Sequence, residues 1–431
     1  MIKIINYIPG ETEVIDRSEE KVDVTAIVAD IIENVKKNGD KALREYAIKF
    51  DGGCPDCLEV SREEIDEAYA SVEPELIAVM EEAAENIREF HRRQVREGFE
   101  FRKEDGIVLG QKILPIEKAG LYVPGGTASY PSTVLMDSIP AKIAGVREIV
   151  MVSPPSKGGH IDKRILAAAK IAGIDRIFAT GGAQAIAALA YGTESVPKVD
   201  KIVGPGNCFV AEAKRQVFGL VNIDMIAGPS EILVVADTTA NPRHVAADLL
   251  SQAEHDKLAS AVLVCDSEDF AKAVQTEVEV QLEALPRRDI ARESIDKRSR
   301  IIVVDNTDMA VDIANELAPE HLELCVKDPF AALDRVRHAG SVFLGMSCPE
   351  ALGDYFAGPN HTLPTGGSAR FSSPLSVDDF VKKTAYTYYT PEALSKVSDK
   401  IAMFAESEGL SAHARSVTVR SASADRQTSV E

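Results

Sequence analysis

The chain has 431 residues, 45% of them hydrophobic, which is enough for about three structural units with large cores. Its 68 acidic and 48 basic residues give a formal net charge of −20, which disfavours nucleic acid as a partner. No run reaches the roughly 18 apolar residues of a membrane helix, the N-terminus lacks a secretory apolar core, and six cysteines are spread thinly. These features predict a cytoplasmic protein without a membrane partner.

The first hundred residues are predicted to be mainly helical. Residues 1–23 are expected to supply a first strand region to a main α/β lobe. Residues 24–100 are expected to form a helical subdomain, because apolar residues recur there at helical spacing. The positions that carry this pattern are Val28, Ile31, Ile32, Val35, Ile77, Met80, Ala84 and Ile87.

From about residue 107 onward, short apolar strands alternate with helices, which is typical of βαβ units on parallel sheets. The fold class is therefore predicted to be α/β, with two Rossmann-like parallel-sheet lobes. The main lobe is expected to comprise residues 101–121 and 230–372, and the second lobe residues 122–229. Residues 373–431 are predicted to form a small C-terminal extension with a polar tail. Ligands in such sheets are expected outside the carboxyl ends of the strands.

Glycine-rich turns follow several of the predicted strands, at residues 121–126, 179–184, 204–207 and 227–230. A backbone without side chains can approach a pyrophosphate closely, and a following helix adds its positive end. None of these turns is a G-x-G-x-x-G fingerprint. Each is compatible with ordinary turn chemistry, and their number in one lobe makes nucleotide binding an equal alternative.

A predicted helix over residues 241–255 begins with the N-cap Asn241 and a proline. Gln252 and His255 are three residues apart and project from one face, which is compatible with metal binding. Such a polar pair is more commonly a solvated helix face, so spacing alone leaves both readings open.

Glu320 and His321 follow a helix that is stopped by Pro319. A carboxyl group beside an imidazole suits general acid–base chemistry. A surface Glu-His pair is the commoner alternative, and the two side chains can share a substrate only if the backbone turns there.

Asp354 and His361 flank a glycine-rich loop, which is costly to order without a function. Glu408 and His413, near the C-terminus, are surface residues on local evidence. Among the cysteines, Cys208 after a glycine turn could trap an aldehyde as a thiolate, although a small buried hydrophobe is the usual role. Cys54 and Cys57 form a lone C-x-x-C without redox context.

Several ordered segments together resemble the histidinol dehydrogenase family, over nearly the whole chain. They are residues 120–126, 204–207, 228–231, 249–256, 318–323, 353–361 and 364–374. The resemblance implies NAD-dependent, four-electron oxidation of L-histidinol through L-histidinal to L-histidine, the last step of histidine biosynthesis.

The resemblance also implies site residues. Zinc would be held by Gln252, His255, Asp354 and His413, a set without thiolates that leaves positions open for substrate. Zinc would mainly orient the substrate, whose own imidazole and amine bind the metal. These four residues would thereby also contact the substrate, and the remaining substrate contacts would be Ser230, His321, His361 and Glu408.

Glu320 and His321 match the acid–base pair of the family, and Tyr122, Gln184 and Asn207 match its NAD contacts. Members of the family are homodimers with shared active sites. By this likeness, Glu408 and His413 in the C-terminal extension serve the neighbouring subunit.

Three alternatives stay open. A related dehydrogenase that oxidises a sulfonated diol should lack the loop at residues 365–374, which is intact here. A zinc hydrolase with the same ligands would act without a nicotinamide cofactor. A non-catalytic dinucleotide-binding protein would not need His321.

Overall fold

The computed structural model describes residues 1–12, 14–15, 17, 23–51, 53–104, 106–125, 130–156 and 158–427. Gly126 of one predicted glycine turn and the last four residues of the predicted polar tail lie outside this set. The chain divides into two compact units. The first unit consists of Met1–Val95 and Ile116–Phe380, and the second of Arg96–Pro115 and Val381–Glu431.

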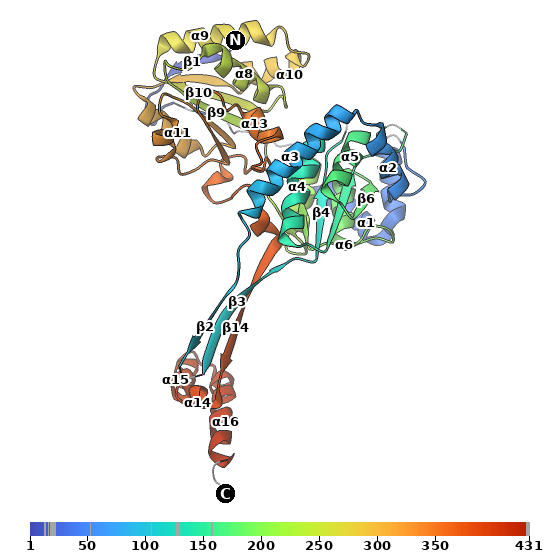
Figure 1. Ribbon diagram of the computed structural model, residues 1–431, viewed down its shortest axis with the longest axis vertical. Coiled ribbons are helices and arrows are strands. Elements are labelled where there is room, and N and C mark those ends of the chain that lie inside the picture. The colour runs from blue at the N-terminus through green and yellow to red at the C-terminus, as the bar shows by residue number, and fades with distance from the viewer. Residues whose placement is uncertain are drawn as a thin grey trace. The chain divides into compact units, whose positions relative to one another are not determined.

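A six-stranded sheet with the order β1-β11-β10-β9-β12-β13 forms one lobe of the first unit, here called the main lobe (Figure 1). All of its neighbouring strands are parallel. Every residue of β9 and β10 is buried, which is why these strands are continuous apolar runs in the sequence. The strands are β1 (Lys3–Asn6), β9 (Glu231–Ala236), β10 (Ser260–Cys265), β11 (Arg300–Val303), β12 (His321–Cys325) and β13 (Ser341–Leu344). The helices are α8 (Pro242–Ala253), α9 (Glu268–Leu282), α10 (Arg288–Lys297), α11 (Thr307–Leu317), α12 (Pro329–Leu333) and α13 (Glu350–Tyr355).

A five-stranded sheet with the order β6-β5-β4-β7-β8 forms the other lobe of the first unit, here called the second lobe. It too is parallel throughout. Its strands are β4 (Lys118–Tyr122), β5 (Glu148–Ser153), β6 (Arg176–Ala179), β7 (Lys201–Val203) and β8 (Asn222–Ile223). Its helices are α4 (Pro131–Ala144), α5 (Lys163–Ala172), α6 (Gly182–Tyr191) and α7 (Cys208–Val217). Two parallel sheets with crossover helices confirm the predicted α/β class.

The N-terminal helices are α1 (Thr25–Tyr46), the π-helix η1 (Ala47–Asp51), α2 (Arg62–Ser71) and α3 (Pro74–Arg92). All eight apolar positions that predicted them are buried. They share the cores of the second lobe, α1 with α6, and α2 and α3 with α4 and α5. The helical stretch ends at Arg92, earlier than the predicted limit of 100. These helices therefore cover the second sheet and have no separate core.

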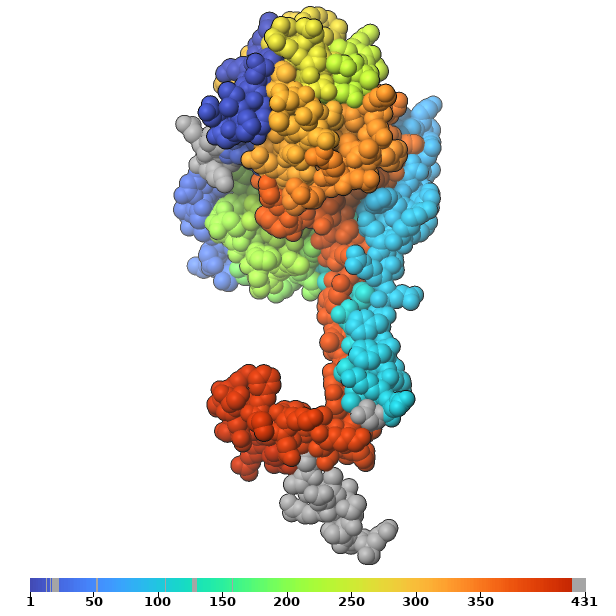
Figure 2. Space-filling model, turned by 90° about the vertical axis from the view of Figure 1, so that its left-hand side faces the viewer, coloured from blue at the N-terminus to red at the C-terminus, as the bar shows by residue number. Residues whose placement is uncertain are grey.

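The second unit contains an antiparallel sheet with the order β14-β3-β2. In Figure 2 the cyan strands β2 (Phe99–Lys103) and β3 (Ile107–Pro115) lie beside the orange strand β14 (Val381–Tyr389). Three helices follow, α14 (Pro391–Ser395), α15 (Ser398–Ser407) and α16 (Ser411–Gln427). Residues 101–121, predicted to lie in the main lobe, are instead divided between this sheet and β4. The reason is that β14, which pairs with β3 along its whole length, lies far along the chain and leaves no local signal.

Two short 3-10 helices, η2 (Ser368–Arg370) and η3 (Val377–Phe380), lie in the segment before β14. None of the helices among the described residues is long and apolar enough to cross a bilayer.

Candidate active site

The predicted site residues of the main lobe lie at the amino ends of its strands. Ser230 comes directly before β9, Glu320 comes directly before β12, and His321 is the first residue of β12. Gln252 and His255 lie at the end of α8, where the chain returns to the sheet and enters β10. These residues therefore lie at the edge opposite to the carboxyl ends of the strands, where ligands were expected. The right-handed crossover returns the carboxyl end of α8 to the amino edge of the sheet.

Glu320 and His321 converge on the backbone of one residue, Glu231. The backbone N–H of Glu231 donates to Glu320 Oε2 at 2.9 Å, and His321 Nδ1 lies 3.1 Å from the Glu231 carbonyl oxygen. Just ahead of them, Ala318 has a left-handed backbone with φ of 49°. The two adjacent side chains face one place, because His321 Nδ1 lies 3.8 Å from Glu320 Oε2.

His321 is a buried imidazole among carboxylates. Its Nδ1 donates to the Glu231 carbonyl, and its Nε2 lies 3.8 Å from Glu350 Oε1 and 3.6 Å from Asp354 Oδ1. Burial alone lowers its pKa, but Glu350, Glu320 and Asp354 together raise the pKa to about 10. Nε2 has no hydrogen-bond partner among the described residues. This nitrogen is therefore available for a hydrogen bond to a bound ligand.

Two of the three carboxyl groups beside His321, those of Glu320 and Asp354, differ in ionisation. Burial raises the pKa of Glu320 to about 7, although the neighbouring His321 acts in the opposite direction. Burial also tends to raise the pKa of Asp354, but the neighbouring His321, with Nε2 3.6 Å from Asp354 Oδ1, outweighs burial and lowers the net value. Asp354 is therefore ionised at neutral pH, whereas Glu320 exchanges a proton near pH 7.

Three of the four predicted metal ligands surround this cluster. Gln252 is completely buried, and Asp354 lies one helical turn into α13, 17% exposed. His255 lies in the turn after α8 and is exposed. The protein atoms around its ring nevertheless lower its pKa by desolvation, although the negative charge of Asp354 acts in the opposite direction. A divalent cation requires a neutral imidazole and an ionised carboxylate, and His255 and Asp354 are in these states. The Gln252 amide supplies an oxygen ligand. The donor set thus fits the group that the sequence predicted.

Glu350 was not among the predicted site residues. It begins α13, four residues before Asp354, so the two carboxylates project from one helix face. One donor atom each from His321, Glu350 and Asp354 lie within 4.8 Å of one another, and a second such group comprises Asp248, Glu323 and Cys325. The spacing of Glu350 and Asp354 is visible in the sequence and could have drawn attention to Glu350.

The segment after α13 joins the two lobes at the site. His361 Nδ1 lies 3.1 Å from the Asp354 carbonyl oxygen, and its Nε2 lies 3.3 Å from Thr133 Oγ1 at the start of α4. The next residue, Thr362, donates to Asp137 on the same helix at 2.8 Å. Burial lowers the pKa of His361, so the ring is neutral with its Nδ1 proton on the carbonyl. The predicted substrate contact His361 is therefore held beside both Asp354 and α4.

The three predicted cofactor contacts lie at the carboxyl edge of the second sheet, as expected. Tyr122 ends β4, and its buried hydroxyl accepts a hydrogen bond from the Gly182 N–H at 3.1 Å. Gln184 is buried in the first turn of α6. Asn207 is exposed after β7, and its Oδ1 caps α7 by accepting from the N–H groups of Phe209 and Val210 at 3.1 Å and 3.2 Å. Two helix N-termini, those of α6 and α7, are thus available at this edge for an anion.

Glu408 and His413 lie in the second unit, at the end of α15 and in the first turn of α16. Both are exposed. All the other predicted site residues lie in the first unit. All six cysteines are free, and Cys208 is exposed as the first residue of α7.

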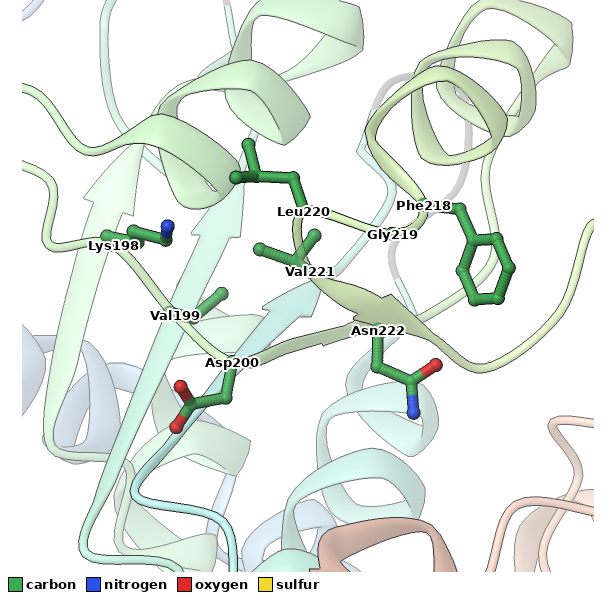
Figure 3. A pocket seen from close by; sticks show the side chains of 8 residues that line it. All are labelled: Lys198, Val199, Asp200, Phe218, Gly219, Leu220, Val221 and Asn222. Atoms are coloured by element: carbon green, nitrogen blue, oxygen red, sulfur yellow. The ribbon is translucent and has the colours of Figure 1, made fainter. Parts of the chain in front are cut away.

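A hollow of about 440 Å³ lies elsewhere, lined by residues 198–200 and 218–222 (Figure 3). These residues come just before β7 and β8 or begin β8, so the hollow is at the amino edge of the second sheet. That edge is opposite to Tyr122, Gln184 and Asn207. The Asp200 carboxylate there accepts from the N–H groups of Glu117 and Lys118 at 3.0 Å and 2.9 Å, which is a structural role. The hollow is not part of the candidate site.

Comparisons with known proteins point to one family. The family model described as histidinol dehydrogenase matches residues 15–421. The chain is similar to histidinol dehydrogenases from Clostridium acetobutylicum, 54% identical over 94% of both chains, and Geobacillus kaustophilus, 57% identical over 91% of this chain and 93% of the relative. A crystal structure of histidinol dehydrogenase from Elizabethkingia anophelis superposes with a TM-score of 0.94 at 41% identity, covering 98% of this chain and 99% of that one.

Proposed function

The chain belongs to the histidinol dehydrogenase family, and we propose that it oxidises L-histidinol through L-histidinal to L-histidine as an NAD-dependent oxidoreductase. The observation that carries the proposal is the convergence of Glu320 and His321 on Glu231, beside the ionised Asp354. An acid–base pair next to metal-type donors is what oxidation of an alcohol and then of a hydrated aldehyde requires. NAD⁺ supplies the hydride acceptor for both oxidations.

His321 is the base for the first oxidation. Its Nδ1 proton is fixed on the Glu231 carbonyl, so its unpartnered Nε2 is the atom that accepts the hydroxyl proton of the substrate. The carboxylates around it raise its pKa to about 10, and neutralisation of Asp354 by a bound cation would lower that value. That shift moves His321 toward the deprotonated form that a base requires.

Glu320 acts in the second oxidation. It is buried and held by the Glu231 N–H, so its carboxylate keeps a fixed position while it accepts a proton from water. A pKa of about 7 is suited to taking up and releasing a proton in each cycle.

We assign the metal to Gln252, His255 and Asp354 of one subunit with His413 of the partner subunit. Bound Zn²⁺ would supply the positive charge that orients the nitrogen atoms and hydroxyl of the substrate. The neutral His255 and ionised Asp354 support this assignment. Ser230, His361 and Glu408 complete the proposed substrate contacts, and Tyr122, Gln184 and Asn207 the proposed contacts with NAD.

The shared site implies a homodimer. Two features of the second unit support it: Glu408 and His413 are exposed there, and so are several large apolar side chains. The latter include Phe99, Phe101, Met403 and Phe404, which are 56%, 46%, 73% and 69% exposed. Exposed apolar surfaces of this kind are typically covered by another chain. The predicted extension began at residue 373, but residues 373–380 belong to the first unit, where Leu375 and Phe380 are part of the core of the second lobe. In this proposal residues 381–431 form the extension that reaches the neighbouring subunit.

Oxidation of a sulfonated diol is the nearest competing activity. Measuring the turnover of histidinol and of the sulfonated diol in parallel distinguishes these two activities. The zinc hydrolase alternative predicts activity in the absence of NAD⁺.

Replacing Glu320 with Gln should uncouple the two oxidations. The amide can still accept from the Glu231 N–H, but it cannot take a proton from water. We expect NADH-dependent reduction of added histidinal to continue, while formation of histidine from histidinal falls by roughly 10²-fold or more. In the wild type, formation of histidine should decline as the pH drops below about 7, because protonation of Glu320 removes the base.

The measurement is histidine and histidinol by chromatography, with NADH followed by absorbance. Glu316→Gln, an exposed glutamate on α11, is the matched control. Unchanged conversion of histidinol to histidine by Glu320→Gln would exclude the role assigned to Glu320.

A further inference from the structure

Glu350 is a buried residue with hydrogen bonds to two other elements of the main lobe. It is only 3% exposed, and its backbone N–H donates to Glu323 Oε1 at 2.8 Å. Its carboxylate accepts from the Ser251 hydroxyl at 3.2 Å. Strand β12 and helix α8, the two elements that carry His321 and Gln252, thus both fix the first residue of α13.

The Gln252 amide lies directly against this carboxylate. When its nitrogen and oxygen are assigned to satisfy their neighbours, Nε2 lies 3.1 Å from Glu350 Oε1, 3.2 Å from Glu350 Oε2 and 3.1 Å from His321 Nδ1. Because His321 Nδ1 already donates to the Glu231 carbonyl, the two N–H groups of the amide donate to the Glu350 carboxylate. The opposite assignment would place the amide oxygen against two carboxylate oxygens, which repel it. In its ionised form, Glu350 therefore selects one of the two orientations of the amide.

Orientation matters because only one end of the Gln252 side chain can bind a cation. The amide oxygen is a metal ligand, whereas the NH₂ group has no lone pair to offer. With Nε2 on Glu350, the oxygen is left on the other side of the amide. Groups behind the ligands that fix their orientation in this way strengthen metal binding.

We propose that Glu350 is a positioning residue that holds Gln252 by its NH₂ group and so reserves the amide oxygen for the metal. The inference rests on the proposed function, because it takes Gln252 as a ligand. Glu350 acts through Gln252 and does not itself bind the metal.

Direct ligation by Glu350 is the main alternative, and the contacts argue against it. Its carboxylate oxygens are already engaged by Ser251 and by the Gln252 amide. Asp354, on the same helix, is the more open carboxylate, 17% exposed against 3% for Glu350. The open group is therefore the ligand, and the enclosed group is its support.

The test measures the affinity of the full-length protein for Zn²⁺ by competition with a chromophoric chelator. Glu350→Met removes the acceptor at similar length and should weaken Zn²⁺ binding by roughly 10–100-fold. Glu316→Met, the same change at an exposed site on α11, should leave the affinity unchanged. Wild-type affinity in Glu350→Met would overturn the inference.

A reversed pair tests the hydrogen bond itself. Gln252→Glu places two carboxylates together, whereas Gln252→Glu with Glu350→Gln restores one amide and one carboxylate with donor and acceptor exchanged. The double variant should bind Zn²⁺ at least about tenfold more tightly than Gln252→Glu alone. Equal affinities would overturn the inference. This comparison keeps a polar pair at the buried site, so it remains decisive if Glu350→Met does not fold.

Gln252→Ala and His255→Ala distinguish failure of this inference from failure of the proposed function. If neither weakens Zn²⁺ binding, the proposed metal site is wrong. If both weaken it while Glu350→Met does not, only the role of Glu350 is wrong.

Discussion

His321→Asn should lower turnover of histidinol by roughly 10²–10⁴-fold while leaving Zn²⁺ affinity within a few-fold of wild type. The asparagine amide can replace the Nδ1 donor to the Glu231 carbonyl, which the imidazole makes at 3.1 Å. It cannot replace Nε2, which faces Asp354 and Glu350 and has no other partner among the described residues. The variant therefore keeps the local structure and loses the proton acceptor.

The measurement is kcat from NADH absorbance, together with Zn²⁺ content and the thermal midpoint. His160→Asn is the control, because this histidine is 77% exposed. Loss of the metal in His321→Asn would reassign His321 as a ligand. Near-normal turnover with metal in place would remove it from the acid–base chemistry.

Mixing His255→Ala with His413→Ala chains should restore activity that neither variant has alone. His255 lies in the first unit and His413 in the second, so in a mixed dimer with exchanged extensions one site contains both defects and the other contains neither. Random pairing makes about half of the dimers mixed, which gives about a quarter of wild-type activity. The measurement is NADH formation after the two chains are unfolded and refolded together.

A matched mixture of His255→Ala with Gln252→Ala is the control. Both defects lie in the first unit, so every site keeps one of them and no activity should return. The absence of recovery with His413→Ala, in mixed dimers verified by mass spectrometry, would show that sites are not shared between subunits.

The sequence was sufficient for the fold class because the buried strands leave strong local signals. Apolar runs such as those of β9 and β10 predict parallel strands, and helical spacing predicts α1 and α3. The sheet of the second unit was not foreseen. Its three strands contain many exposed residues, and β14 joins them from far along the chain, so no local pattern marks the sheet.

The sequence predicted which residues belong to the candidate site, but not how these residues are arranged. Spacing indicated Gln252 with His255 and adjacency indicated Glu320 with His321, but each pair also fitted a solvated surface. The sequence could not predict that Glu320 and His321 contact the same residue, because both contacts are to the backbone of Glu231, which has no side-chain signature. The placement of the main-lobe residues at the amino edge of the sheet was likewise contrary to the general rule.

The central claim is that Gln252, His255 and Asp354 assemble with His413 of the partner subunit around a cation that the alcohol requires. The most direct test is to strip the purified protein with a chelator, supply histidinol and NAD⁺, and follow NADH absorbance before and after Zn²⁺ is returned. The account predicts no NADH from the stripped protein and, once Zn²⁺ is returned, two NADH for each histidinol consumed. Undiminished NADH formation by protein verified to be free of metal would contradict it.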